Sequence, residues 1–470
     1  MNTLVKRTTL FAMIALLLVS VFALTMPQRE AYASQPGQPA YYAERWQECV
    51  AKVSPTQTTL PVWNGADAGI APNGAGDGSR ENPYIVDTPE EFRYCLKQNL
   101  SCKLDADLDL GWTRNADGTD AGPNWCVGAI AITKGIVIDG NGHTIYNLRA
   151  TGSSNVGLIG SVAGGLQDPD TGFVIKNLNL KSATVYTSAG NQCAATLVAQ
   201  FLSGTADNCH VTDALVNTLN GGGNGTGGLF APECKGGTGL TIKNTVAKNV
   251  NVYGKGCVSG FIEGPWNYAA SLTIENCAAV DGTVISTGGH SGGFTSCVQV
   301  SGKAVYKNCY TNLDVYGNTE TGVFVGVTHA GTHEFENCYA AGKIEGTTKI
   351  GGFFGCPSSS TRETFTNCYS TSMVGMSDGG NYMGGFAGEG GATSNFVNCY
   401  AAGEVGSLKS KPDGTPIGTS NVTGFSGNNA GNFTNCYYDK QTTGMCNHGE
   451  EPTNVTGLLT KQLFAKDLGV

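Results

Sequence analysis

Asn337-Cys338-Tyr339-Ala340-Ala341-Gly342 is the stretch of this sequence that decides the fold, because its first three residues return along the chain. Asn-Cys-Tyr occurs five times, and looser copies stand upstream. Successive Asn residues of these copies lie 29 to 37 residues apart. A period near 30 predicts one short unit stacked on itself, in which each unit buries the apolar face of its neighbour.

The residues on either side of each Asn indicate which positions face the interior. Two residues before it stands an apolar or aromatic side chain, such as Ile242 or Phe365, and one residue after it the later copies have Cys. Strict strand alternation would place these two positions on opposite faces, so we expect a bend at the Asn. Asn tolerates the left-handed conformation, and its amide can bond the amide of the next unit. The predicted structural ladder comprises Asn177, Asn208, Asn244, Asn276, Asn308, Asn337, Asn367, Asn398 and Asn435 with Cys309, Cys338, Cys368, Cys399 and Cys436.

Short strands bent at Asn and Gly describe the coils of a parallel β-helix. We therefore predict an all-β fold, a right-handed parallel β-helix solenoid of about ten coils with ~30-residue repeats. The open end of a solenoid needs a cover. Thr88-Pro89-Glu90-Glu91 predicts a short N-terminal α-helical cap over about 88–98, with Thr88 as the N-cap. A β-propeller or a sandwich is the alternative architecture, although propeller blades need ~40 or more residues.

The chain begins like a secreted protein. Lys6-Arg7, an apolar run over 10–24 and Ala31-Tyr32-Ala33 predict a signal peptide cleaved after Ala33. A net charge of −9 without a basic block argues against nucleic acid as a partner, and the lack of a second long apolar run argues against membrane insertion. The expected division is 1–33 signal peptide, 34–75 linker or N-terminal extension, 76–126 N-terminal cap, 127–447 repeats and 448–470 C-terminal tail.

Several of these stretches resemble the GLUG repeat of bacterial surface proteins. Gly157-Leu158-Ile159-Gly160 and the Asn-Cys-Tyr-Ala-Ala-Gly stretches at 337–342 and 398–403 carry the resemblance, and 138–145 looks like the segment that precedes such repeats. The resemblance implies a β-helix of adhesin-like or uncharacterised cell-surface proteins. GLUG repeats also accompany some immunoglobulin-cleaving metalloproteases as an accessory region, so the resemblance brings no catalytic residue to this chain.

The function expected from these patterns is that of a secreted or surface-displayed, non-catalytic, adhesin-like protein that binds a host or cell-surface glycan or protein. A polysaccharide lyase or glycosidase is the first alternative, and a passive spacer of a larger envelope protein is the second. Gly289-His290-Ser291-Gly292-Gly293 matches a nucleophile-elbow pattern, but it occupies a repeat position rather than a strand-to-helix turn. His333-Glu334 lacks the second His of a zinc-protease helix. We expect no cofactor and no metal, with a calcium ion at the acidic turns as the open alternative.

A tyrosine column and the cysteines complete the expectations. If the Cys column faces inward, the next residue faces outward, and such a stripe could bind glycans by ring stacking or simply stabilise the stack. The candidate ligand-binding residues are Tyr310, Tyr339, Tyr369, Tyr400 and Tyr437. Ladder cysteines are expected to be mostly free thiols, because parallel Cβ vectors disfavour disulfide geometry. Disulfides are expected instead among Cys49, Cys95, Cys102, Cys126, Cys234, Cys257, Cys297 and Cys356.

The sequence leaves several properties open: the ligand, the mode of anchoring, the oligomeric state and the nature of the terminus. The chain stops soon after Leu463-Phe464. A truncated gene, a shorter natural variant or non-covalent attachment would each explain that end.

Overall fold

The computed structural model describes most of the chain. The described ranges are 39–67, 69, 71–126, 130–188, 192–218, 225–232, 237–264, 271–358, 361–406, 420–428, 430–445 and 452–464. The expected signal peptide, residues 1–33, and Cys234 lie outside these ranges.

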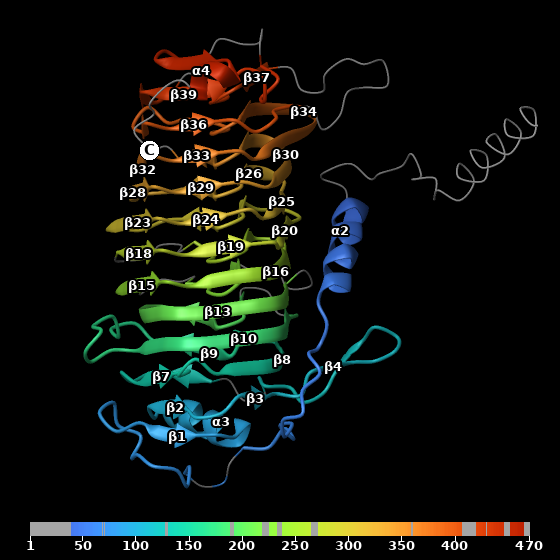
Figure 1. Ribbon diagram of the computed structural model, residues 1–470, viewed down its shortest axis with the longest axis vertical. Coiled ribbons are helices and arrows are strands. Elements are labelled where there is room, and N and C mark those ends of the chain that lie inside the picture. The colour runs from blue at the N-terminus through green and yellow to red at the C-terminus, as the bar shows by residue number, and fades with distance from the viewer. Residues whose placement is uncertain are drawn as a thin grey trace, which may run out of the picture.

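The described chain forms an elongated solenoid of stacked parallel strands (Figure 1). The predicted all-β β-helix fold is therefore confirmed. It has about eight complete turns, slightly fewer than the ten expected, since the coils at both ends lack part of a face. Among the described strands, only the hairpin of β4 (Thr113–Arg114) and β5 (Asp120–Ala121) pairs antiparallel.

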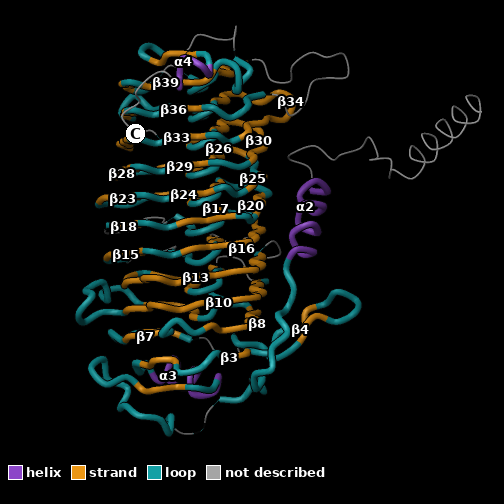
Figure 2. The backbone as a smooth tube through the Cα atoms, in the orientation of Figure 1, coloured by secondary structure: helices purple, strands orange, loops and turns teal. Residues whose placement is uncertain are grey.

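Each coil runs over three faces joined by bends (Figure 2). The first face stacks β1 (Tyr84–Val86), β2 (Cys102–Leu104), β7 (Val137–Asp139), the first part of β10 (Val174–Thr187) and of β13 (Ser203–Asn217), β15 (Gly239–Lys243), β18 (Leu272–Glu275), β23 (Lys303–Lys307), β28 (Gly331–Glu336), β32 (Thr361–Thr366), β35 (Asn395–Val397) and β38 (Asn432–Thr434).

The second face follows the Asn bend and is itself bent once, at left-handed residues such as Asn147 and Asp281. It stacks β3 (Leu108–Asp109), β8 (Thr144–Gly152), the rest of β10 and β13, β16 (Val246–Gly254), β19 (Ala278–Val280), β20 (Thr283–Ser286), β24 (Tyr310–Thr311), β25 (Asp314–Tyr316), β29 (Tyr339–Ala340), β30 (Lys343–Gly351), β33 (Tyr369–Ser370), β34 (Met373–Gly384), β36 (Tyr400–Ala401), β39 (Cys436–Asp439) and β40 (Val455–Leu458).

The third face returns the chain to the first. It stacks β6 (Ala131–Ile132), β9 (Ile159–Val162), β12 (Val198–Phe201), β22 (Thr295–Val298), β27 (Val325–Thr328) and β31 (Phe354–Pro357). The short strands that lead into it are β11 (Cys193–Ala194), β14 (Gly225–Gly227), β17 (Cys257–Ser259), β21 (Ser291–Gly292), β26 (Thr319–Gly322) and β37 (Ser420–Thr423).

The nine ladder Asn residues form the bend between the first two faces, and each adopts a left-handed φ of 50° to 55°. From Asn276 to Asn435 every ladder Asn donates its Nδ2 to the Oδ1 of the Asn in the coil before it, over 3.1 to 3.3 Å. The ladder breaks below this run, because Asn244 bonds Asp207 instead of Asn208. The amides therefore satisfy one another at a corner where strand pairing is interrupted.

Stacked rings fill the core. Phe335, Phe365, Phe396 and Phe433 stack at 4.8 to 4.9 Å between ring centroids. A second column, from Phe294 to Phe425 through the Gly-Phe positions, stacks at 4.7 to 5.1 Å and meets the first edge-on. Burying such a side chain contributes about 1.5–3 kcal/mol, so these columns supply much of the cohesion between coils.

The cysteines of the ladder are buried beside these rings. Their Sγ atoms approach backbone carbonyls, as Cys338 does with Tyr306 O at 3.5 Å. The disulfides expected elsewhere are wrong for the described residues, where no cysteine is in a disulfide. Those side chains have other partners: Cys102 bonds the Cys95 thiol, and Cys126 donates to Gly157 O.

Helix α3 (Pro89–Gln98) covers the N-terminal end, as predicted, with Thr88 accepting from the Glu91 backbone N–H. A second helix, α2 (Pro39–Lys52), lies along the second face within the expected linker 34–75 (Figure 1). Its Tyr41, Tyr42 and Trp46 cover a strip formed by Leu215, Tyr253, Ile285 and Tyr316. A short helix, α4 (Thr460–Phe464), lies beyond β40. No helix in the described ranges is both long and apolar enough to cross a lipid bilayer.

Candidate functional site

The tyrosine column lies on the second face, directly after the Asn bend. Strand register aligns Tyr310, Tyr339, Tyr369 and Tyr400 in consecutive coils. Their ring centroids lie 5.0, 4.2 and 5.1 Å apart, and their planes are tilted by at most 27°. We call these four residues the tyrosine stripe.

The stripe is half-buried, and because neighbouring rings stack on one another, it presents ring edges and hydroxyls rather than ring faces. Partial burial raises the pKa of Tyr310, Tyr369 and Tyr400 above the ordinary value, and neighbouring Tyr hydroxyls add to the shift. The rings are therefore neutral at physiological pH and act as hydrogen-bonding, weakly polar surfaces rather than as charges.

Tyr437 stands in register with Tyr400 but is buried. The physical reason is β40, which pairs in register with β39 and places Thr456 beside Tyr437. The structure therefore brings four of the five predicted ligand-binding residues together at the surface, and the fifth lies under the C-terminal strand.

Small side chains, some of them polar, border the stripe. The Asn ladder lies on one side, and on the other a column of Asn312, Ala341, Thr371 and Ala402 follows two residues after each Tyr. Tyr339 Oη and Thr371 Oγ1 are 2.5 Å apart, which ties neighbouring coils together. With rungs ~4.8 Å apart, the stripe extends over roughly 14 Å along the solenoid. It forms a flat aromatic strip without a deep pocket.

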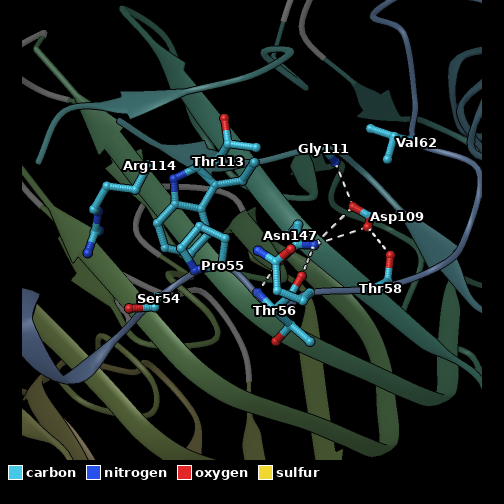
Figure 3. A pocket seen from close by; sticks show the side chains of 12 residues that line it. Ser54, Pro55, Thr56, Thr58, Val62, Asp109, Gly111, Thr113, Arg114 and Asn147 are labelled. Atoms are coloured by element: carbon cyan, nitrogen blue, oxygen red, sulfur yellow. Dashed lines mark hydrogen bonds between the residues drawn. The ribbon is translucent and has the colours of Figure 1, made fainter. Parts of the chain in front are cut away.

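A cavity of about 630 Å³ lies between the chain after α2 and the first coils (Figure 3). Its one buried carboxylate, Asp109, accepts from Thr58 Oγ1, Gly111 N and Asn147 Nδ2. Arg114 donates to Val50 O and Val53 O and pairs with Asp120. These groups fasten the extension to the solenoid, so their hydrogen-bonding capacity is already used in holding the chain.

Two residues from the chemical motifs singled out in the sequence, Ser291 and His333, lie inside the solenoid. Ser291, from the nucleophile-elbow pattern, is buried, and its hydroxyl lies 3.1 Å from Thr321 Oγ1. His333 is also buried, with Nε2 2.7 Å from His329 O. The acidic turns engage their own neighbours, as Asp107 does with His143 at 3.1 Å. Ser291 and His333 are therefore closed to solvent, whereas the acidic turns lie at the surface and bond local partners.

One cluster escaped the sequence analysis. His290, Cys297 and His329 come together where the third face begins, with their donor atoms all within 4.8 Å of one another. Cys257 lies one coil from His290, and Cys297 one coil from His329, a spacing that matches the repeat. That spacing could have indicated the cluster in the sequence. The signal is weak, because His290 and Cys297 occupy different positions of the repeat.

Comparison with known proteins assigns no family to this chain. No family model matches the chain, so the resemblance to GLUG repeats stays a resemblance. Halomucin of Haloquadratum walsbyi is 32% identical over 166 residues, which cover 33% of this chain and 2% of that protein. The chain thus spans a very small part of this relative.

A crystal structure of a "putative immunoglobulin A1 protease" from Bacteroides ovatus is also similar, at 18% identity and a TM-score of 0.35. The alignment covers 77% of this chain and 85% of that one. At this identity and score the similarity carries no conclusion about activity.

Proposed function

We propose that this chain is a non-catalytic, extracellular β-helix protein of adhesin type, which binds a cell-surface glycan through the tyrosine stripe. The observation that carries the proposal is the stack of four half-exposed, neutral rings in consecutive coils. Each stacked ring presents an apolar edge beside a polar hydroxyl, which suits the C–H groups and the hydroxyl rim of a sugar ring.

The geometry favours an extended ligand. Successive rings lie one rung apart, so a linear glycan lying along the solenoid would meet the same surface at each coil. The bordering Asn, Thr and Ala side chains carry no charge, and Asp281 beside Asn312 places a negative charge near Tyr310. Both features favour a neutral glycan over a polyanionic one. A protein ligand is the alternative outcome, because Tyr is also enriched at protein interfaces.

Three observations support a binding role over catalysis. Polysaccharide cleavage by acid–base chemistry needs converging carboxylates, or a base with a cation, at a substrate groove. Asp281, near Tyr310, is engaged by Asn312, Asp109 is already saturated by donors, and Ser291 is buried. The partial similarity to Halomucin is compatible with an extracellular location.

The experiment is a glycan and extracellular-matrix protein array probed with labelled wild-type protein and with Tyr339→Ala/Tyr369→Ala. Each truncation of a central contact residue typically costs more than about 1 kcal/mol, so the double variant should bind at least ~30-fold more weakly. Tyr94→Ala, a half-buried Tyr on α3, is the matched control and should bind like the wild type. Equal binding by all three proteins would show that the tyrosine stripe is not the glycan-binding surface.

A further inference from the structure

A cluster of nitrogen and sulfur donors lies at the bend that leads into the third face, away from the tyrosine stripe. The donor atoms of His290, Cys297 and His329 all lie within 4.8 Å of one another. Cys297 is fully buried, whereas the two imidazoles are half-buried, so the group has a protected floor and a side open to solvent.

Strand register explains why these residues meet. β17 and β21 pair with Val258 opposite Ser291, which places Cys257 beside His290 in the next coil. β22 and β27 pair with Val298 opposite Thr328, so His329 follows at the end of β27, one coil above β22. The two imidazole rings lie 5.8 Å apart between centroids. Three successive coils thus contribute side chains to one place.

We propose that His290, Cys297 and His329, with Cys257 as the fourth donor, form a binding site for a zinc-class transition-metal ion. Two imidazoles and two thiols are the donor set of four-coordinate zinc sites. The Cys297 thiol hydrogen-bonds that of Cys257, and Cys257 also lies close to His290. Cys257 is therefore placed to complete the set.

The surroundings supply the second layer of contacts that metal-binding histidines need. Glu320 Oε2 lies 2.6 Å from His290 Nδ1, which leaves Nε2 as the nitrogen available to a metal. Lys349 Nζ in turn lies 3.4 Å from Glu320 and 3.0 Å from Glu389. This chain of ion pairs fixes the carboxylate, and the carboxylate fixes the imidazole.

The distances are close to those that a metal requires. Tetrahedral bonds of ~2.0–2.3 Å separate ligand atoms by roughly 3.3–3.8 Å. The three donors must approach one another by about 1.5 Å at most, which rotations of half-exposed imidazoles can provide.

The test uses the full secreted chain, purified with a reductant, stripped with a chelator and titrated with Co²⁺ as a spectroscopic probe. We expect one equivalent to bind, with a thiolate-to-cobalt charge-transfer band and the intense visible bands of four-coordinate cobalt, and Zn²⁺ should displace it. His290→Gln and His329→Gln should each abolish both bands. Glu320→Gln should keep them and weaken binding about 10- to 100-fold.

Two controls separate a built site from surface histidines and from misfolding. His143→Gln, a half-buried His paired with Asp107 in another part of the solenoid, should leave the titration unchanged. Each metal-free variant must keep the wild-type circular dichroism spectrum and melting temperature to be scored. Binding that survives His290→Gln and His329→Gln, or a Cys257–Cys297 disulfide found by mass spectrometry in the secreted protein, would overturn the proposal.

Discussion

Replacing Asn337 by Ala tests what holds one coil to the next. The side chain donates to Asn308 Oδ1 over 3.1 Å and accepts from Asn367 Nδ2 over 3.1 Å, at a backbone φ of 53°. Each bond at this exposed corner is worth about 0.5–1 kcal/mol. The left-handed conformation costs Ala about 1 kcal/mol more than Asn. We therefore expect a local loss of about 2–3 kcal/mol.

Hydrogen exchange followed by mass spectrometry measures this loss coil by coil. Peptides covering β28 and β29 should lose roughly 30- to 150-fold of their protection, because every 1.4 kcal/mol is tenfold. Peptides from β7 and β8 should be unchanged, since a solenoid is coupled chiefly to its nearest neighbours. Asn337→Gly, which relieves the backbone strain, should lose about 0.5–1 kcal/mol less than Asn337→Ala. A change below about threefold in β28 and β29 would refute the ladder as a source of stability.

Three further predictions concern other parts of the molecule. Trp46→Ala should release α2 from the strip around Tyr253, because the two ring centroids lie 5.4 Å apart and the truncation costs about 3 kcal/mol. The release should appear as proteolysis near residues 53–58, which the exposed control Gln47→Ala should not show. Unchanged cleavage of Trp46→Ala would contradict the packing. Burial raises the pKa of Cys209 to about 12, so iodoacetamide at neutral pH should label it only after unfolding; rapid native labelling would show that the thiol is accessible. Hydrogen bonds from Lys97 and Arg93 lower the pKa of Asp67. The stability advantage of the wild type over Asp67→Asn should therefore be present above pH ~4 and fade as pH falls through the folded-state pKa. A difference in urea midpoint that does not depend on pH would contradict the role of these ion pairs.

The Asn bend could be predicted from sequence because one residue type fills it in every coil. The next bend has the same left-handed backbone, but Asn147, Ser182, Asp213 and Asn249 fill it. Different residues with short polar side chains solve the same steric problem, so no repeat was visible there. The positions that repeat one residue type were enough to predict the fold, whereas the bend with varying residues is recognised only in the structure.

The candidate sites differ in the same way. The tyrosine stripe was predictable because it repeats beside the Asn, yet the burial of Tyr437 depends on β40, which follows the repeats. Helix α2 covers a strip to which four coils contribute one side chain each. These side chains differ in type, so no repeated residue indicated the strip in the sequence. The His290 cluster joins residues from different repeat positions, and only strand register brings them together.

The most direct test of the account is a calorimetric titration of wild-type and Tyr369→Ala protein with the glycan that gives the strongest array signal. Reducing ends and unsaturated products are assayed in the same samples. The account predicts binding that Tyr369→Ala weakens at least ~5-fold, with no new chain ends. Cleavage of the glycan, or equal affinity of the two proteins, would contradict it.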